Sequence, residues 1–375
     1  MKKTLLGVFL LFLALSNLTL AQNDLQGTLN KLAGKAAMGY IDPITQGFLT
    51  NINGGLFNKA PQAKLWGIDI ELGAAFMYTP LGDLPKTFDE KGAFRFNKAQ
   101  ADEIASNTIT TGSSPALVTA LRNSLSTALQ QSDFNIRIYG PTVLGEKAVV
   151  GNPNSPQVKV DMSATVTARY TVPVINTQRD TSFFVNYALK TGLGGVGALS
   201  GSAGVPFFAP QLTLGTIFGT KFTLRYVPKI PIPDVGDLSW TGFGIQHNLG
   251  YWFPIPVVDL AASFYTQKIK IDPIFEMSGT SFGLTASKQL GFAFLNVTPY
   301  AGFMLESSKL TVNITPPAAD YGPGITPPKI SFDVEGKNTS RFVVGLGLRI
   351  LIININADYN IGKYNSMTAG LAIAF

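Results

Sequence analysis

Residues 353–375 read ININADYNIGKYNSMTAGLAIAF, and this stretch decides the fold. Apolar residues occupy every second position of its last part: Met367, Ala369, Leu371, Ile373 and Phe375. The part before it alternates in the same way with Asn and Asp, and Gly362-Lys363-Tyr364-Asn365 separates the two. Because successive side chains of a strand point to opposite faces, this period of two predicts two strands joined by a turn. Each strand has one apolar face and one polar or small face.

The same alternation recurs through most of the chain. It covers the ranges 66–78, 160–170, 222–226, 258–264, 282–286 and 342–350. Further candidate strands lie near 134–140, 181–190, 210–218, 240–250, 292–308 and 328–335. The total is about 12 to 14 strands. The apolar parity changes from even to odd numbers at Leu351-Ile352, which predicts a tight turn or a β-bulge there, because a slip of one residue exchanges the two faces.

Composition and strand length favour a barrel that crosses a membrane. The chain has 375 residues, of which 46% are hydrophobic and 14% charged, and its mean hydropathy is +0.21. After residue 15, however, no apolar run approaches the ~18 residues of a membrane helix. The strands exceed the ~5–6 residues of soluble ones, and their polar faces carry Gly, Ser, Thr and Asn, as a lumen does. We predict an all-β fold: a transmembrane antiparallel up-and-down β-barrel of about 14 strands, with 12 as the lower count. A soluble periplasmic β-protein is the alternative.

The tryptophans and the C-terminus fit the same prediction. Trp240 and Trp252 are 12 residues apart. In a tilted strand that separation is ~30 Å, near the spacing of two aromatic girdles. We therefore expect Trp66, Trp240 and Trp252 at the membrane interfaces. The C-terminal strand also looks like the signal read by the outer-membrane barrel assembly machinery, carried by Tyr364, Met367, Leu371, Ile373 and Phe375.

The N-terminus predicts export. Met1-Lys2-Lys3 is a short basic segment, Leu5–Leu15 is apolar, and an expected cleavage site follows Ala21, so residues 1–21 are interpreted as a signal peptide. With the barrel pattern, this predicts the outer membrane of a Gram-negative bacterium, reached by Sec-type export. The chain has no cysteine, which excludes disulfides, thiolate catalysis and cysteine-bound metals. Its net charge of +6 includes no basic runs, so we expect no nucleic-acid partner.

Two segments lack the strand pattern. Residues 22–64 contain small residues and turn signals, and we expect them to be either a plug inside the barrel lumen or a periplasmic tail. Residues 65–375 are expected to form the barrel, with a helix-containing insertion at about 81–158. Within the insertion, Ser114-Pro115 predicts the start of a helix. Leucines then recur at every fourth position: Leu117, Leu121, Leu125 and Leu129. The proline-rich range 315–328 is expected to be a loop.

Charged residues on the polar strand faces are the candidate lumen-lining residues. They are Asp69, Glu71, Asp161, Arg169, Lys221, Arg225, Asp259, Arg341, Arg349 and Asp358. Both signs occur in similar number, so these side chains either pair and fix the barrel or line a polar path through it. Structural pairing is the favoured interpretation.

No catalytic, cofactor-binding or metal-binding residue is predicted. His247 is the only histidine and shares the parity of apolar neighbours, which disfavours it as the base of a Ser–His hydrolase. Gly279-Thr280-Ser281-Phe282-Gly283 matches a nucleophile elbow, but it opens an alternating strand instead of a strand-to-helix turn. One histidine without cysteine is too little for a zinc site. We therefore expect neither an enzyme nor a cofactor.

Six short motifs are spread over the chain. They are Tyr40-Ile41-Asp42-Pro43, Asn53-Gly54-Gly55, Tyr139-Gly140-Pro141-Thr142, Ala209-Pro210-Gln211-Leu212, Leu224-Arg225-Tyr226-Val227-Pro228 and Gly244-Ile245-Gln246-His247. Together they resemble an uncharacterised family of secreted Gram-negative proteins, a domain of unknown function, over nearly the whole mature chain. The resemblance implies an outer-membrane barrel and no activity. More loosely, the small-residue N-terminal segment ahead of the strands is similar to that of FadL-type transporters of long-chain fatty acids and aromatic hydrocarbons. Their Asn-Pro-Ala hatch motif is not present, and the resemblance supplies no binding residue.

The predicted function is a channel for small hydrophobic solutes. The alternative is a structural or interaction barrel that presents extracellular loops and transports nothing. The expected partners are outer-membrane lipid, the barrel assembly machinery and, for the channel, a small hydrophobic solute.

Overall fold

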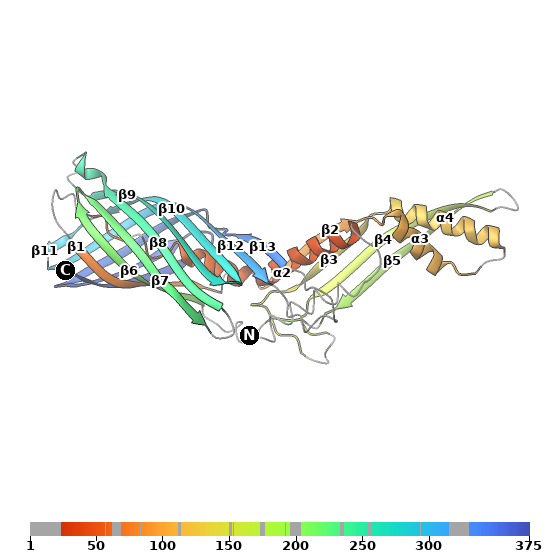
Figure 1. Cartoon of the computed structure of the whole chain (residues 1–375), viewed down its shortest axis with the longest axis horizontal. Coiled ribbons are helices and arrows are strands. Elements are labelled where there is room, and N and C mark those ends of the chain that lie inside the picture. The colour runs from red at the N-terminus through yellow and green to blue at the C-terminus, as the bar shows by residue number, and fades with distance from the viewer. Residues whose placement is uncertain are drawn as a thin grey trace. The chain divides into compact units, whose positions relative to one another are not determined.

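The chain folds into two compact units, which are described separately. The computed structural model describes residues 24–56, 58–61, 69–82, 84–111, 114–149, 152, 154–172, 177–191, 193–195, 204–232, 236–253, 257–292, 294–314 and 330–375. The predicted signal peptide, Trp66 and the 315–328 loop lie outside these residues. One unit comprises Met1–Pro43 with Pro85–Ser202, and the other comprises Ile44–Leu84 with Ala203–Phe375. Helix α2 (Asp24–Ile52) contributes residues to both (Figure 1).

The second unit is a closed antiparallel barrel of ten strands. Its strands are β1 (Asp69–Pro80), β6 (Gly204–Ile217), β7 (Thr220–Ile232), β8 (Gly236–Asn248), β9 (Asp259–Asp272), β10 (Phe275–Ser287), β12 (Leu295–Ile314), β14 (Ser340–Ile350), β15 (Ile353–Ile361) and β16 (Ser366–Ala374). The order around the ring is β10-β9-β8-β7-β6-β1-β16-β15-β14-β12, and pairing of β12 with β10 closes it. Two short strands, β11 (Leu290–Phe292) and β13 (Ile330–Glu335), add to β12. A 3₁₀ turn, η1 (Leu249–Tyr251), follows β8.

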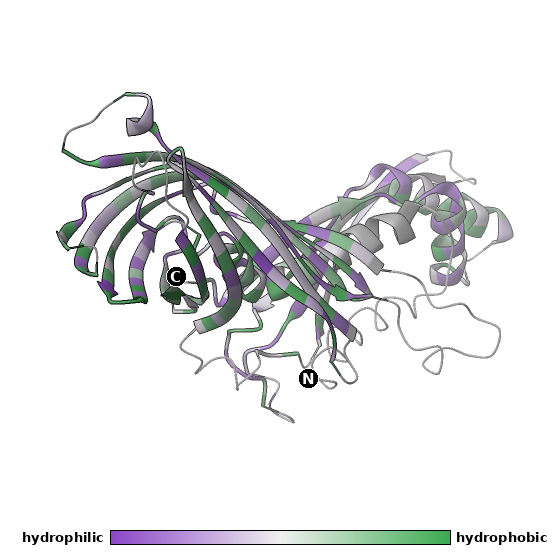
Figure 2. Cartoon of the chain, turned by 60° about the vertical axis from the view of Figure 1, so that its left-hand side comes forward, coloured by the Kyte–Doolittle hydropathy of each residue, from purple (hydrophilic) through white to green (hydrophobic). Residues whose placement is uncertain are grey.

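The faces of the barrel strands are arranged as the alternation predicts. On β16, Leu371 points outward and is 58% exposed, whereas Thr368 points inward and is 3% exposed. The colour alternates in the same way along the other strands (Figure 2). An apolar outside with a polar inside is the arrangement of a membrane barrel and the reverse of a soluble one. The predicted antiparallel barrel is confirmed, although its ring contains ten strands and not about 14.

The two ends of the barrel differ in their connections. At the end where β16 stops, here called the C-terminal end, residues 218–219, 249–258, 288–294 and 351–352 join the strands. At the opposite end, residues 81–203 join β1 to β6, residues 315–339 lie between β12 and β14, and the short connections are residues 233–235, 273–274 and 362–365. The parity change predicted at Leu351-Ile352 is a two-residue turn, in which Leu351 has a φ of 55°.

The first unit is a four-stranded antiparallel sheet with helices. The sheet has the order β2 (Thr87–Phe94), β3 (Phe134–Pro141), β4 (Lys159–Val172) and β5 (Thr177–Lys190). Helix α3 (Lys98–Thr108) packs on α4 (Pro115–Gln131), which packs on β4. The helix start predicted at Ser114-Pro115 is confirmed, because the Ser114 side chain accepts a hydrogen bond from the backbone N–H of Leu117. Leu125 and Leu129 are buried beneath the helix.

This sheet explains why the barrel has fewer strands than predicted. The ranges 134–140, 160–170 and 181–190 alternate as barrel strands do, but they form β3, β4 and β5. Here the apolar face, with Ile136, Ile138 and Val166, is buried in a protein core. Among the described residues, no helix has both the length and the apolar character needed to cross a membrane.

The core of the first unit should be sensitive to truncation of Phe134. Phe134 is 2% exposed, and its ring stacks on Phe94, with ring centroids 5.4 Å apart, and meets Phe96 edge to face at 4.7 Å. Phe134→Ala should lower the free energy of unfolding of this unit by ~3–5 kcal/mol, because it leaves a cavity. Limited proteolysis of residues 85–202 would measure the effect, with Phe184→Ala (65% exposed) as the control. Equal protease resistance of the two variants would contradict this packing.

Candidate functional site: the barrel lumen and its inner segment

Residues 44–61, here called the inner segment, lie inside the barrel and are described except for residue 57. The segment begins as the last turns of α2, which end at Ile52. The chain then turns at Gly54-Gly55, where Gly55 has a φ of 65°, a conformation that glycine adopts without steric cost. A non-helical chain in a lumen leaves backbone groups unpaired unless the wall supplies partners. The wall supplies them in three layers.

The first layer, near the opposite end, contains a buried ion pair. Arg341 on β14 and Glu306 on β12 form two parallel hydrogen bonds, Nε to Oε1 at 2.8 Å and Nη2 to Oε2 at 2.7 Å. Their side chains are 0% and 1% exposed. The same Nη2 donates to the carbonyl oxygen of Thr50 at 2.7 Å. The pair therefore joins two wall strands to the inner segment at one point.

Asn51 makes a second contact in this layer. Its Nδ2 donates to the carbonyl oxygen of Val205 at 2.7 Å, and its Oδ1 accepts the hydroxyl of Thr79 at 2.7 Å. All three residues are buried. The last turn of α2 is thereby fixed to β6 and β1.

The middle layer surrounds Arg225 on β7, which is 1% exposed. Its guanidinium donates to the carbonyl oxygens of Gly54 at 3.0 Å and Gly55 at 2.9 Å. Gln267 on β9 donates to the carbonyl oxygen of Ile52. Carbonyl groups at the C-terminus of a helix carry partial negative charge, so this helix end is a suitable partner for a buried cation.

Trp240 belongs to this layer, which corrects the prediction that it lies at a membrane interface. It is 5% exposed, and its indole Nε1 donates to Oε1 of Gln267 at 3.1 Å. Its spacing from Trp252 suggested two girdles, but only Trp252, 66% exposed at the C-terminal end, is on the outside. The prediction failed because Trp240 shares the inward parity of Gly242 and Gly244 on β8.

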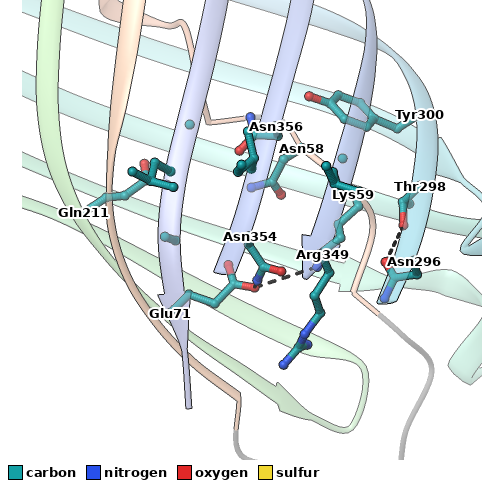
Figure 3. Close-up of a pocket in the computed structure, with 16 residues that line it drawn as sticks. Asn58, Lys59, Glu71, Gln211, Asn296, Thr298, Tyr300, Arg349, Asn354 and Asn356 are labelled. Atoms are coloured by element: carbon teal, nitrogen blue, oxygen red, sulfur yellow. Dashed lines mark hydrogen bonds and ion pairs between the residues drawn. The ribbon is translucent and has the colours of Figure 1, made fainter. Parts of the chain in front are cut away.

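The third layer lies near the C-terminal end (Figure 3). Lys221 on β7 donates to Oδ1 of Asn58 at 2.6 Å. Lys59 lies 3.9 Å from the carboxylate of Glu71, which accepts a 2.7 Å hydrogen bond from Nδ2 of Asn354. Just beyond, Asn248 donates to the carbonyl oxygen of Pro61 at 2.5 Å. The contacts in the three layers thus hold the inner segment between Thr50 and Pro61.

A small polar cavity remains beside Lys59. Its lining includes Asn58, Lys59, Glu71, Asn296, Arg349 and Asn354 (Figure 3), and its volume is about 30 Å³. One water needs ~10–15 Å³ on this measure, so the cavity has room for about two waters. It is too small and too polar for a hydrophobic solute.

Eight of the ten predicted lumen residues lie on the inner wall of the barrel. Glu71, Lys221, Arg225 and Arg341 contact the inner segment. Asp358 instead accepts hydrogen bonds from wall residues Tyr300 and Asn360, and Asp259 accepts one from Asn248. Arg349 donates to the carbonyl oxygen of Leu351 at the barrel rim. Asp69, at the start of β1, shares the inward parity of Glu71.

The other two predicted lumen residues, Asp161 and Arg169, are outside the barrel. They lie on β4 in the sheet of the first unit, so the prediction for them was wrong. Arg169 donates to Asp180 on β5 at 2.8 Å, and this hydrogen bond keeps the pKa of the Asp180 carboxyl below its usual value. The error has the same origin as the strand count, since a period of two does not tell a lumen from the polar face of another sheet.

Several wall residues that hold the inner segment were not predicted. Glu306 shares the inward parity of Tyr300 and Met304 on β12, and the alternation of 292–308 contained that signal. The neutral Gln267 and Asn354 were missed because only charged residues were considered. Their inward position could have been predicted from the same alternation, because both share the parity of the inward-facing residues on their strands.

The remaining candidates do not form a catalytic site. His247 faces outward, accepts the indole N–H of Trp252 at Nε2 (2.7 Å) and has Nδ1 3.0 Å from the Thr220 hydroxyl. Ser281 faces inward and is 1% exposed, so the two lie on opposite faces of the wall. Across the residues that the structure describes, no three His, Cys, Asp or Glu side chains gather in a way that could hold a metal ion.

The residues of the predicted assembly signal occupy β16 and the turn before it. Met367, Leu371, Ile373 and Phe375 are 44–71% exposed on the outside, whereas Tyr364 is buried at 8%. Their outward position suits contact with lipid or with another protein. Recognition by the assembly machinery stays a prediction.

Removing one partner of the buried ion pair should destabilise the barrel strongly. Glu306→Gln leaves the Arg341 charge uncompensated in the lumen, which should lower the free energy of unfolding by ~3–5 kcal/mol. Urea unfolding in lipid vesicles, followed by tryptophan fluorescence, would measure it. Lys309→Gln is the matched control, because Lys309 and Asp333 form a half-exposed pair at 2.8 Å whose loss should cost about 0–1 kcal/mol. If the two substitutions had equal effects, the ion pair would not anchor the structure.

Comparisons with known proteins give a family and structural likenesses. A loop-deletion mutant of OmpT, an outer membrane protein of Vibrio cholerae, has 8% identity and a TM-score of 0.23, with 82% of this chain and 98% of that chain covered. In-vitro folded OmpT of Vibrio cholerae in its trimer form has 8% identity and a TM-score of 0.24, with the same coverage. OprB of Pseudomonas putida has 7% identity and a TM-score of 0.15, with 82% and 92% covered.

These likenesses are too low to carry an argument, and the barrel assignment rests on the strand pairing of the chain itself. A search of curated proteins finds no match. A family model described as a family of unknown function matches residues 1–375. The chain therefore belongs to this family of unknown function, DUF6588.

Proposed function

We propose that this protein is an outer-membrane barrel with a closed lumen, which anchors and displays the unit formed by residues 85–202. The observation that carries the proposal is the set of buried contacts that fixes the inner segment inside the barrel. Arg341 with Glu306 and Arg225 with the α2 end are almost completely buried, so moving the segment would remove carbonyl acceptors from two buried cations.

The outer surface of the barrel supports a membrane location. Large apolar side chains point outward around the ring, for example Leu72 (60% exposed), Phe208 (65%) and Leu346 (52%). A belt of large apolar side chains around the barrel is unfavourable in water and favourable in lipid. The outer membrane is the membrane in which barrels of this kind occur.

The unequal connections support an orientation. In outer-membrane barrels, short turns face the periplasm and long connections face the outside. Both ends have short turns, but the two longest connections, residues 81–203 and 315–339, lie at the opposite end, whereas the longest at the C-terminal end is residues 249–258. On this rule, residues 85–202 are displayed on the cell surface.

The displayed unit has the surface of a protein that folds in water. Its sheet carries exposed ion pairs such as Arg137 with Asp89, at 2.8 Å, which lowers the pKa of the Asp89 carboxyl. Its other face is a buried core with Phe134 and Ile138. Such a unit gains nothing from lipid, which suits a recognition or structural role outside the membrane.

The hydrophobic-solute channel predicted from the sequence has less support. The inner wall carries Thr, Ser, Asn, Gln and charged side chains, and a hydrophobic solute would have to replace their hydrogen bonds. A channel would also require the inner segment to leave the lumen. Removal of the segment is therefore the decisive manipulation.

Surface labelling tests the display. Since the chain has no cysteine, Asn186→Cys on the exposed strand β5 gives a single reactive thiol. A membrane-impermeant maleimide should label it on intact cells as fully as on permeabilised cells. Ser281→Cys, inside the barrel wall, should not react in either and serves as the control. Labelling of residue 186 only after permeabilisation would reverse the proposed orientation.

Conductance in planar bilayers tests the closed lumen. The full mature chain should be silent, whereas deletion of residues 22–60 should open a water-filled pore, because it removes most of the segment that fills the lumen. Deletion of residues 22–43 retains the inner segment and should remain silent. A steady current through the full chain, or an unchanged record after the larger deletion, would refute the closed lumen.

A further inference from the structure

The connections at the C-terminal end of the barrel carry large apolar side chains. Those that are at least 46% exposed are Phe218, Trp252, Phe253, Val257, Leu290, Phe292, Phe294, Leu351, Ile352 and Phe375. They come from every connection described at this end and from the C-terminus. A turn that projects into water would normally carry Gly, Asn, Asp or Ser. These ten residues, here called the rim, therefore form an apolar edge around the C-terminal end of the barrel.

Two rim residues occupy backbone positions that disfavour them. Phe218 has a φ of 52° and Leu351 a φ of 55°, a region in which glycine or asparagine is the usual choice. Bulky side chains there are strained, yet both are exposed, at 46% and 65%. The Phe218 ring meets the edge of Tyr251, with ring centroids 6.0 Å apart, yet about half of the Phe218 surface and more of the Leu351 surface stay exposed.

The rim is held in place by the backbone. The N–H of Leu351 donates to the carbonyl oxygen of Phe294 at 2.6 Å, and that of Ala374 donates to Ile352 at 2.7 Å. The N–H of Asn248 donates to Gly219 at 2.8 Å. Neighbouring turns are thus bonded to one another, which keeps their side chains outside the barrel.

The height of the outer apolar belt indicates what covers the rim. On β12, outward residues are apolar or proline from Leu295 to Leu305 and become polar at Ser307 and Lys309. At ~3.3 Å per residue and a tilt of ~40°, this stretch is about 25 Å tall, which is the full height of a lipid-facing belt. On β12 the belt reaches its required height only if it begins at the rim, so on this strand no polar margin separates the lipid from the turn.

We propose that the turn tips at the C-terminal end are immersed in the headgroup–acyl boundary of a phospholipid leaflet. The rim continues the lipid-facing belt of β12, and its apolar side chains come from every connection described at this end, whereas a protein partner would be expected to use a patch on one side. The part of the barrel unit that lies outside the membrane is then at the opposite end, where β9, β10 and β12 extend beyond the belt. The inference rests on the proposed membrane location and specifies the depth of the barrel in the bilayer.

Single cysteines in this cysteine-free chain can test the depth. Leu351→Cys and Phe292→Cys report the rim, Leu346→Cys reports the middle of the belt, and Ser331→Cys on β13 reports water at the opposite end. Each full-length variant is labelled with bimane in phosphatidylcholine vesicles with and without doxyl-labelled lipid, and its fold is checked by heat-modifiable gel mobility. Phe292 has an ordinary φ and provides a rim position if the substitution at 351 prevents folding.

The expected result is that bimane at 351 and 292 is quenched by doxyl lipid, as it is at 346. A water-soluble maleimide should react at both rim positions at least about tenfold more slowly than at 331, because the interface excludes it. If both rim cysteines react as fast as residue 331 while residue 346 is quenched by lipid, the barrel is in the membrane but the rim inference is overturned. If residue 346 is not quenched either, the membrane location fails and the inference fails with it.

Discussion

The structure depends on one constraint: a chain placed inside a barrel must have its backbone polar groups satisfied by the wall. Arg225 and Arg341 meet it by donating to the carbonyl oxygens of Gly54, Gly55 and Thr50. Each cation also gains from the inner segment, whose carbonyl oxygens add to the wall acceptors, Glu306 for Arg341 and Gln267 for Arg225. The wall and the segment therefore stabilise one another, which is the basis for proposing a closed lumen.

Much of the fold follows from the period of two, and its errors have one cause. Leu371 and Val166 both occupy the apolar face of an alternating strand, but Leu371 is 58% exposed on the barrel and Val166 is 0% exposed in a core. A period of two does not tell whether the apolar face of a strand lies on the outside of a barrel or in a protein core. Strands 160–170 and 181–190 were therefore assigned to the barrel, and the strand number was too high. The helix at Ser114-Pro115 was predictable because its capping chemistry is local.

The candidate site was predictable in part for a similar reason. Inward parity and charge identified Arg225, Arg341 and Glu71. The partners of Arg225 and Arg341 in the inner segment are backbone carbonyls, and Lys221 pairs with Asn58, more than a hundred residues away. No local pattern specifies such pairings. The apolar composition without long apolar runs is resolved by the same geometry. The hydrophobic residues face outward at alternate positions and reach the turn tips of one end.

The most direct test of the central claim is a disulfide between the inner segment and the wall. A Cβ built on Gly47 of α2 lies 3.4 Å from Cβ of Val205 on β6, close to the ~3.5–4.5 Å of a disulfide. Gly47→Cys combined with Val205→Cys should oxidise completely in the cysteine-free chain, leaving no thiol for maleimide until a reductant is added. Two thiols that remain free and react with maleimide in the folded barrel would show that the segment is not held against the wall.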